Sequence, residues 1–207
     1  IAGVMYCARL LRAGRSPERS VVCDAWTAEE SGLLGSEAYA SRPLFPLETT
    51  VANFTLDILQ TAGLARDVIQ VGEGQSELEQ DLARAAALQG RTVTPENLPE
   101  NGLFFRADHF SLARRGVPVL LLMGIAGGAD LVEGGRTAGD KWIADYTGNC
   151  YHQTCDAWSP EWDLRGAVQD IELFQSIITD LANSSRWTEL LPSSEFKSIR
   201  DESRHLR

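Results

Sequence analysis

Apolar residues near the start of the chain recur at the spacing of a helix. Ile1, Val4, Met5 and Leu11 fall on one helical face, which predicts a helix over residues 1–14. The segment 27–41 passes through a glycine-marked loop into a second helix. Apolar spacing and glycine stops predict the remaining helices at 76–90, 108–116 and 162–184.

The helix at 76–90 carries clear end signals. Ser76 can cap its first turn, and Glu79 follows three residues later, as in a capping box. Gly90 can end the helix in a left-handed conformation. These signals bound the predicted helix on both sides.

Short apolar runs without polar alternation predict strands that are buried on both faces. They occupy 21–26, 49–59, 65–72 and 117–124, and the run at 65–72 is the weakest. The glycine-rich stretch 124–150 is predicted to be a long loop, and loops of that length in compact domains usually serve function. The sequence from Trp187 onward is predicted to be a polar tail.

Helices that alternate with such strands predict an α/β fold. We expect a three-layer sandwich, with a mostly parallel, mixed central sheet flanked by helices. No internal repeat or linker divides the chain, so residues 1–207 are predicted to form a single domain. No cap residue precedes the first helix, and we therefore expect this domain to begin before Ile1 and to lack its N-terminal portion here.

The charge balance limits the partners. The chain has 29 acidic and 19 basic residues, for a net charge of −10, so phosphate backbones are repelled and nucleic acid is not an expected partner. No apolar run approaches the roughly 20 residues that a membrane-spanning helix needs. We expect no membrane span.

Polar residues that follow the predicted strands are candidates for chemistry, because open α/β sheets bind ligands beyond the carboxyl ends of their strands. Glu29 and Glu30 follow the first strand, Asp57 ends the second, and His152 follows the glycine-rich stretch. Carboxylates and an imidazole suit zinc with an open position for water. Each residue alone also has an ordinary explanation, as a helix-start acid, a turn residue or a surface histidine.

Four cysteines leave alternatives open. Cys7 and Cys23 fall in a predicted helix and strand, where buried free cysteine is the ordinary outcome. Cys150 and Cys155 flank His152 closely and could form a short disulfide or bind a metal. A disulfide would indicate an exported protein.

Four stretches together resemble the co-catalytic zinc exopeptidases, which include bacterial leucyl aminopeptidases, aminopeptidase Y and the glutamate carboxypeptidase group. They occur in the order of that family and cover most of the chain. The stretches are "TAEESGLLGSEAYA", "NFTLDIL", "GLFFRADHFSLARRGVPVLLL" and "CYHQTCDAWSPEWDLRGAV". "EESGLLGS" with a downstream "YHQ" is the most specific part.

The resemblance implies a role for each candidate. Glu29 would be the general base, while Glu30, Asp57 and His152 would bind zinc. Tyr151 resembles a tyrosine that hydrogen-bonds the tetrahedral oxyanion in some members. The expected activity is removal of N-terminal residues from peptide substrates by a metal-activated water.

Other features of the resemblance are less specific. Asp108 and His109, in "RADH" where the family often has "RSDH", would line the substrate pocket or support it. A Cys150–Cys155 bridge and family habit imply a periplasmic or secreted protein whose signal sequence is not in this chain.

The sequence also departs from the family pattern. Family members bind two zinc ions with five ligands, and two of these, a histidine and a bridging aspartate, lie upstream of the glutamate pair. No histidine precedes His109 here, and Asp24 lies in the wrong strand context. Thr55 stands where asparagine is usual. We therefore expect one zinc or none in this chain, and little or no activity by itself.

Two other functions remain open. Glutaminyl cyclases share the fold, use a single zinc and carry paired glutamates, and Asp108 would then be catalytic. Against this, Tyr151 precedes the histidine where cyclases usually have tryptophan. A peptidase-like scaffold without activity is the third alternative, although Glu29, Glu30, Asp57 and His152 all persist. The sequence does not predict the oligomeric state, the side-chain specificity or the choice between amino-, carboxy- and dipeptidase.

Overall fold

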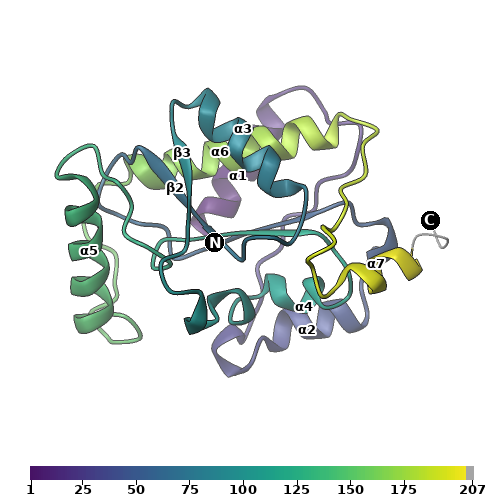
Figure 1. Ribbon diagram of the computed structural model, residues 1–207, viewed down its shortest axis with the longest axis horizontal. Helices are drawn as coiled ribbons and strands as arrows, with labels where there is room; N and C mark the ends of the chain where they lie inside the picture. Colours follow the sequence, from purple (N-terminus) through teal and green to yellow (C-terminus); the bar gives the residue numbers. More distant parts are fainter. Residues whose placement is uncertain (204–207) are drawn as a thin grey trace.

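A computed structural model describes residues 1–203 of the chain. Its main elements follow one another as an α/β succession (Figure 1). They are α1 (Ala2–Ala13), α2 (Leu34–Ser41), β1 (Asn53–Asp57), β2 (Asp67–Val71), α3 (Leu78–Leu88), β3 (Thr92–Pro95), α4 (His109–Ala113), β4 (Val119–Met123), α5 (Gly135–Asn149), α6 (Arg165–Ala182) and α7 (Lys197–Ser203).

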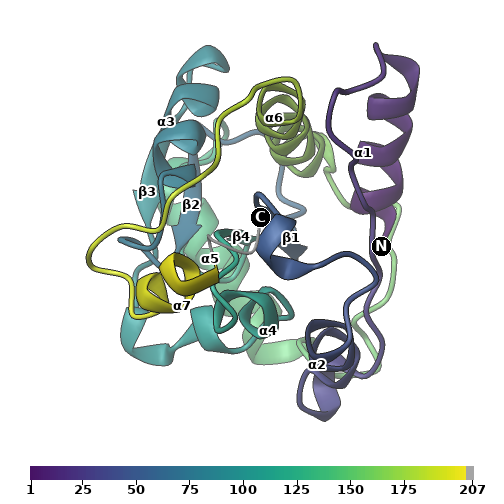
Figure 2. The ribbon, with the colours of Figure 1, turned by 90° about the vertical axis from the view of Figure 1, so that its right-hand side faces the viewer.

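The four strands form one mixed sheet in the order β1-β4-β2-β3. β1 pairs parallel with β4 and β2 pairs parallel with β3, whereas β2 and β4 are antiparallel. Helices α1, α3 and α6 lie on one side of the sheet, and α2, α4 and α7 lie on the other, while α5 stands at one end (Figures 1 and 2). The predicted α/β class, with a mixed, mostly parallel sheet between helices, is confirmed.

The core consists of two apolar layers, one on each face of the sheet. Leu120 and Leu122 of β4 point toward α3 and α6, where Leu173 and Phe174 meet them. The intervening Leu121 belongs to the opposite layer, in which Phe104, Met123 and Phe196 are members. Because alternate strand residues face opposite sides, burial of both faces explains the unbroken apolar run that predicted this strand.

The predicted start of α3 is present as a reciprocal cap. Ser76 Oγ accepts a hydrogen bond from the Leu78 N–H at 3.3 Å, and Glu79 Oε1 accepts one from the Ser76 N–H at 3.2 Å. Gly90 adopts φ 70° just beyond the helix. The local signals in the sequence therefore predicted both ends of this helix correctly.

Residues 21–26 were predicted to be a strand, and this prediction was wrong. The segment forms no strand, and Val22 is 47% exposed. β1 is an edge strand of the sheet, and no strand within residues 1–203 pairs with its free edge or with this segment. A strand needs a neighbour for its backbone hydrogen bonds, so β-branched composition alone does not produce one.

The prediction of one long loop over 124–150 was also wrong, because α5 occupies most of it. Gly134 and Gly135 both have positive φ and allow the sharp turn into the helix. Gly139 is the helix's buried residue, where it approaches the backbone of Ala129. Because α5 buries so little of its surface, it carries no stripe of apolar residues. The 3.6-residue spacing that would predict a helix is therefore missing from its sequence.

The segment after Trp187 is more ordered than the predicted polar tail. Leu190 and Phe196 are buried in the second core layer, and α7 follows them. Arg200 is 1% exposed and donates a hydrogen bond to the Thr50 carbonyl at 2.9 Å. The short strand β3 was not predicted either, since four residues carry too little pattern.

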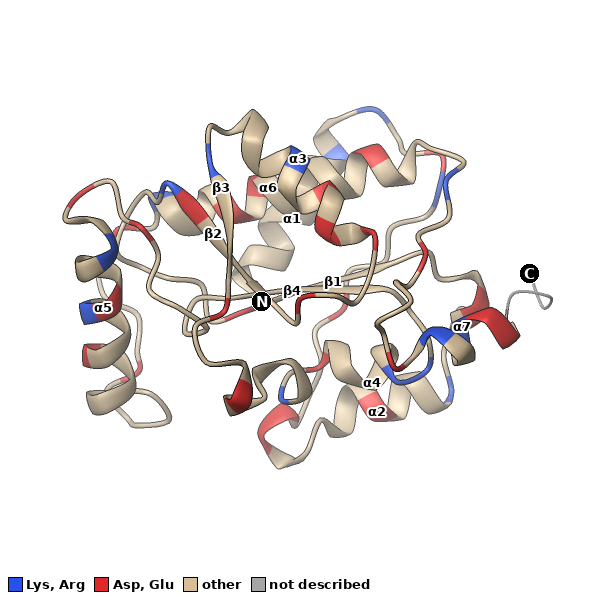
Figure 3. Ribbon diagram, viewed as in Figure 1, with Lys and Arg blue, Asp and Glu red and all other residues tan. Residues whose placement is uncertain are grey.

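Charged residues are spread over the molecule. Acidic positions occur in both helical layers and on α5, without one dominant face (Figure 3). No helix within residues 1–203 is long and apolar enough to cross a membrane.

Candidate functional site

Five of the predicted site residues line one cavity of about 510 Å³. Glu29 and Glu30 come from a 3-10 turn before α2, and Asp57 is the last residue of β1. Tyr151 and His152 come from the turn after α5. All five residues line this cavity, so the structure brings together side chains that are separated by up to 123 positions along the chain (from 29 to 152).

Backbone strain is concentrated around this cavity. Among residues 1–203, the non-glycine residues with positive φ are Ala28 (54°), Leu33 (58°), Ile58 (45°) and His152 (59°). Ala28 directly precedes Glu29, and the other three residues, among them Ile58 directly after Asp57, line the cavity. Such conformations cost about 1–3 kcal/mol each and cluster at functional sites. For the β-branched Ile58, positive φ is a genuine outlier.

Glu30 and His152 form a direct pair. His152 Nε2 lies 2.9 Å from Glu30 Oε1, and the two side chains are 50% and 71% exposed. An exposed pair of this kind contributes about 0–1 kcal/mol to stability. Its importance is therefore chemical: two donor types that zinc prefers point at the same space.

The carboxylates around this pair raise one another's pKa values. Burial raises the pKa of Glu29, and the charges of Glu30, Asp57 and Asp108 raise it further. Burial is also the main cause of the raised pKa of Asp57, followed by Asp108 and Glu30. A bound cation would relieve this accumulation of negative charge.

Asp108 lies beside the cavity and adds to that charge. Burial raises the pKa of its carboxyl group, and a hydrogen bond from Ser36 lowers it in part. One oxygen of Asp108, Oδ1, is buried without a hydrogen-bond partner. Unsatisfied buried oxygens are rare in proteins and often mark a site where a ligand or water completes the set.

These residues fit zinc in their chemistry but are not close enough to one another to hold it. Two carboxylates and an imidazole are suitable donors, and a catalytic zinc takes three protein ligands. Within residues 1–203, however, no three His, Cys, Asp or Glu side chains are close enough to hold a metal ion. The structure therefore assembles the Glu30–His152 pair and leaves Asp57 outside a complete ligand group.

His109 lies away from the cavity. It is fully buried, and its ring meets Phe104 edge-on with the centroids 4.9 Å apart. Neither ring nitrogen has a hydrogen-bond partner, and burial lowers the pKa of His109 to about 3. His109 therefore does not line the cavity in this structure. Its contact with Phe104 is consistent with the other predicted role, in which it supports the pocket from behind.

Several cavity residues were not identified from the sequence. Tyr146 on α5 donates a hydrogen bond to Asp156 Oδ2 at 2.8 Å and stacks on Trp142, with centroids 5.5 Å apart. Both Tyr146 and Asp156 line the cavity. The spacing of Trp142 and Tyr146, four residues apart, is a signal for a helix that places both rings on one face. The glycine-rich composition of 124–150 predicts a loop instead and conceals this signal. An apolar wall is completed by Leu33, Leu103, Phe105, Phe110 and Met123.

The cysteines divide into a pair and two free thiols. Cys150 and Cys155 form a disulfide, which closes a short loop around His152. Cys7 is free and buried, and burial raises its pKa to about 11. Cys23 is free but exposed, contrary to the expectation of burial, because residues 21–26 do not join the sheet.

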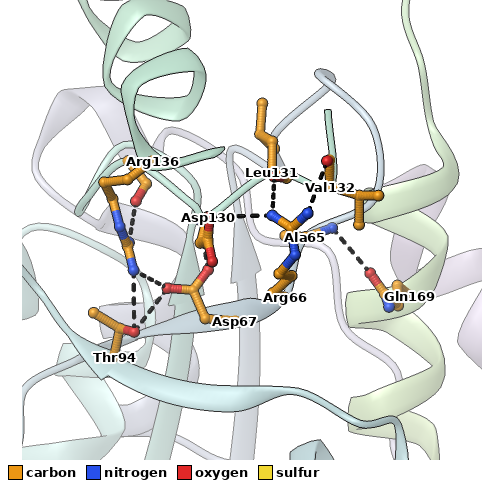
Figure 4. Close-up of polar contacts among 10 residues, drawn as sticks. Ala65, Arg66, Asp67, Thr94, Asp130, Leu131, Val132, Arg136 and Gln169 are labelled. Atoms are coloured by element: carbon orange, nitrogen blue, oxygen red, sulfur yellow. Dashed lines mark hydrogen bonds and ion pairs between the residues drawn. The ribbon is translucent and has the colours of Figure 1, made fainter. Parts of the chain in front are cut away.

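A buried polar cluster fixes the helix that leads to His152 (Figure 4). Asp67 at the start of β2 is 2% exposed and accepts hydrogen bonds from Arg136 at 2.5 Å and Thr94 at 2.7 Å. Its other oxygen accepts from the Asp130 N–H at 2.7 Å. Arg136 lies in the first turn of α5. Asp67 therefore bonds to β3, to the loop that precedes α5, and to α5 itself.

The fold and the cavity define an α/β protein whose mixed sheet is accompanied by a cavity lined by paired acids and a histidine. The sequence profile of peptidase family M28 matches residues 1–174, and the chain belongs to this family. The predicted resemblance is thereby confirmed: this is a metallopeptidase family of co-catalytic zinc exopeptidases, whose members act on peptides and generally bind zinc. A comparison with curated proteins finds no match.

Proposed function

We propose that this protein is a zinc-dependent exopeptidase of the aminopeptidase type, which removes N-terminal residues from peptides. The observation that carries the proposal is the convergence of Glu29, Glu30, Asp57 and His152 on one cavity. The positive φ values beside these residues support it, since strained conformations of this kind cluster at functional sites.

Glu30, His152 and Asp57 are the residues that would contribute ligands to zinc, although within residues 1–203 they do not form a complete ligand group. A zinc ion held there would supply Lewis acidity, which would lower the pKa of a water molecule and polarise the scissile carbonyl group. Glu29 takes a proton from the attacking water and passes it to the leaving amine. Its raised pKa suits this exchange, because a base works best when its pKa approaches the working pH.

Tyr151 donates a hydrogen bond to the oxygen on which negative charge develops. Burial, followed by the charge of Glu30, raises the pKa of its phenol, so the proton stays available for donation. The acids around the cavity also favour binding of a peptide through its N-terminal ammonium group. This preference supports an aminopeptidase over a carboxypeptidase.

We also propose that residues 1–207 belong to a single catalytic domain and have little or no activity by themselves, because the described residues contain no complete ligand group. The experiment is a fluorogenic aminoacyl-amide assay of this chain with added zinc, with Glu29→Gln as the control. We expect no zinc-dependent turnover above that control. Turnover at rates typical of the family, abolished by Glu29→Gln, would refute the proposed inactivity and support the proposed function.

One observation favours a glutaminyl cyclase as the second candidate. The Oδ1 atom of Asp108 is buried without a hydrogen-bond partner, and the cyclase reaction would require this carboxyl group to exchange a proton with the substrate. Release of ammonia from a peptide with N-terminal glutamine would indicate the cyclase. Release of a free N-terminal amino acid would indicate the aminopeptidase.

The disulfide supports a proposal about location. Disulfides persist in oxidising compartments and are rare in the cytosol. We propose a periplasmic or secreted protein. Fractionation of cells that produce the natural protein tests this, and recovery in the cytosol with Cys150 and Cys155 reduced would contradict it.

A further inference from the structure

Arg106 is a cation without a partner in an acidic cavity. It follows the turn Leu103–Phe105, is exposed and lines the cavity. Its guanidinium group forms no ion pair or hydrogen bond with any other side chain that the structure describes. Its positive charge acts on Tyr151, next to His152, so it shares the space of the acid–histidine pair.

Arg114, which lines the same cavity, differs from Arg106 because its guanidinium group has partners. Arg114 Nη2 lies 2.6 Å from Glu37 Oε2, and its guanidinium carbon lies 5.8 Å from the centre of the Phe110 ring. Both arginines line the cavity, but only Arg106 keeps its donors free. A guanidinium group presents a fork of N–H donors that matches a carboxylate with two parallel hydrogen bonds.

We propose that Arg106 binds the C-terminal carboxylate of a short peptide whose N-terminal ammonium group lies among the carboxylates of the cavity. The inference rests on the proposed peptidase function and names its substrate class: dipeptides and tripeptides. The cavity, at about 510 Å³, is in the usual range for small-molecule sites, so only a short peptide reaches both charged regions. The apolar wall of Leu103, Phe105 and Phe110 receives a side chain.

The test is peptide binding to the 207-residue chain, followed by NMR, so that it does not depend on catalysis. The probes are Leu-Gly, its C-terminal amide, and Leu-Glu amide, whose carboxylate is in the side chain. We expect Leu-Gly to bind about fivefold more tightly than its amide, the effect of one partly exposed ion pair. Leu-Glu amide should bind like Leu-Gly amide.

Three variants locate the effect. Arg106→Gln should abolish the preference for the free carboxylate, and Arg106→Lys should keep part of it through charge alone. Arg114→Gln is the matched control and should keep the full preference, because its guanidinium group is already engaged by Glu37. Arg106 is exposed and unpaired, so its replacement should leave the melting temperature unchanged.

Several outcomes would overturn the proposal. Equal affinities for Leu-Gly and its amide would do so on the unaltered chain alone, and so would failure of both peptides to bind. Tight binding of Leu-Glu amide would assign Arg106 to an acidic side chain instead. The aminoacyl amides that test the proposed function carry no carboxylate. A negative result here therefore leaves the peptidase assignment to be decided by its own assay.

Discussion

The buried histidine of α4 makes a quantitative prediction about acid stability. His109 is fully buried, and burial lowers its pKa from 6.5 to about 3. In the unfolded chain the same side chain takes up a proton below about pH 6.5. Because the unfolded state then binds more protons than the folded state, His109 destabilises the fold as the pH falls below 6.5 and toward 3.

The magnitude follows from the distance to the usual pKa. A solution at pH 5 is about 1.5 units below the pKa of His109 in the unfolded chain. At roughly 1.36 kcal/mol per unit, protonation of the unfolded chain lowers the free energy of unfolding by about 2 kcal/mol. At pH 7.5 the cost is close to zero, because both states are neutral. His109 alone is therefore expected to remove about 2 kcal/mol between these two pH values.

The measurement is urea denaturation at pH 7.5 and pH 5.0 for the natural chain and for His109→Phe. Phenylalanine keeps the edge-on contact with Phe104 and cannot titrate. The variant should lose about 2 kcal/mol less than the natural chain, and its other ionisable groups cancel in the comparison. His152→Gln, at a half-exposed position, is the matched control and should keep the loss assigned to His109.

The result that would refute this reasoning is an equal loss of stability in both proteins. It would mean that His109 takes up its proton in the folded state and that the α4 region opens to water. At pH 7.5 the phenylalanine variant should be at least as stable as the natural chain, since it removes two buried nitrogens that lack hydrogen-bond partners.

Three further substitutions test the elements that hold the site. Leu173→Ala, at a fully buried position, should lower the free energy of unfolding by about 2–5 kcal/mol in urea titrations. Ser76→Ala removes the acceptor at the start of α3 and should cost about 1 kcal/mol; no change would show that the cap adds nothing. Asp67→Ala leaves the partly buried Thr94 hydroxyl and Asp130 N–H without their acceptor and should cost about 1–3 kcal/mol. Hydrogen exchange should then accelerate in α5 more than in α3, and uniform acceleration would argue against a local role for Asp67.

Elements with local signals were the ones that the sequence predicted well. The α3 helix carries its own cap and stop, and β4 has an apolar run that only a doubly buried strand needs. Helix α5 was missed because a contact distant in sequence holds it: Arg136 binds Asp67, which lies 69 positions earlier. No pattern within the stretch 124–150 records that partner.

Some residues of the candidate site could be found from the sequence, and others could not. The search after predicted strands led to Glu29, Glu30 and Asp57, and the search after the glycine-rich stretch led to His152. In the structure only Asp57 ends a strand, although all four residues line the cavity. The walls of the cavity could not be found this way. Arg106 follows a turn and Tyr146 lies within a helix, so neither stands at a strand end.

The candidate ligands stand on segments that the fold supports differently. Glu29 and Glu30 follow residues 21–26, which have no strand partner within residues 1–203. The two acids are therefore positioned only by a short 3-10 turn between Ala28 and Gly32, both in left-handed conformations. Asp57, in contrast, is fixed by its pairing with Met123. One candidate ligand, Asp57, thus stands on a paired strand, whereas Glu30, which contacts His152, stands on a turn that no strand supports.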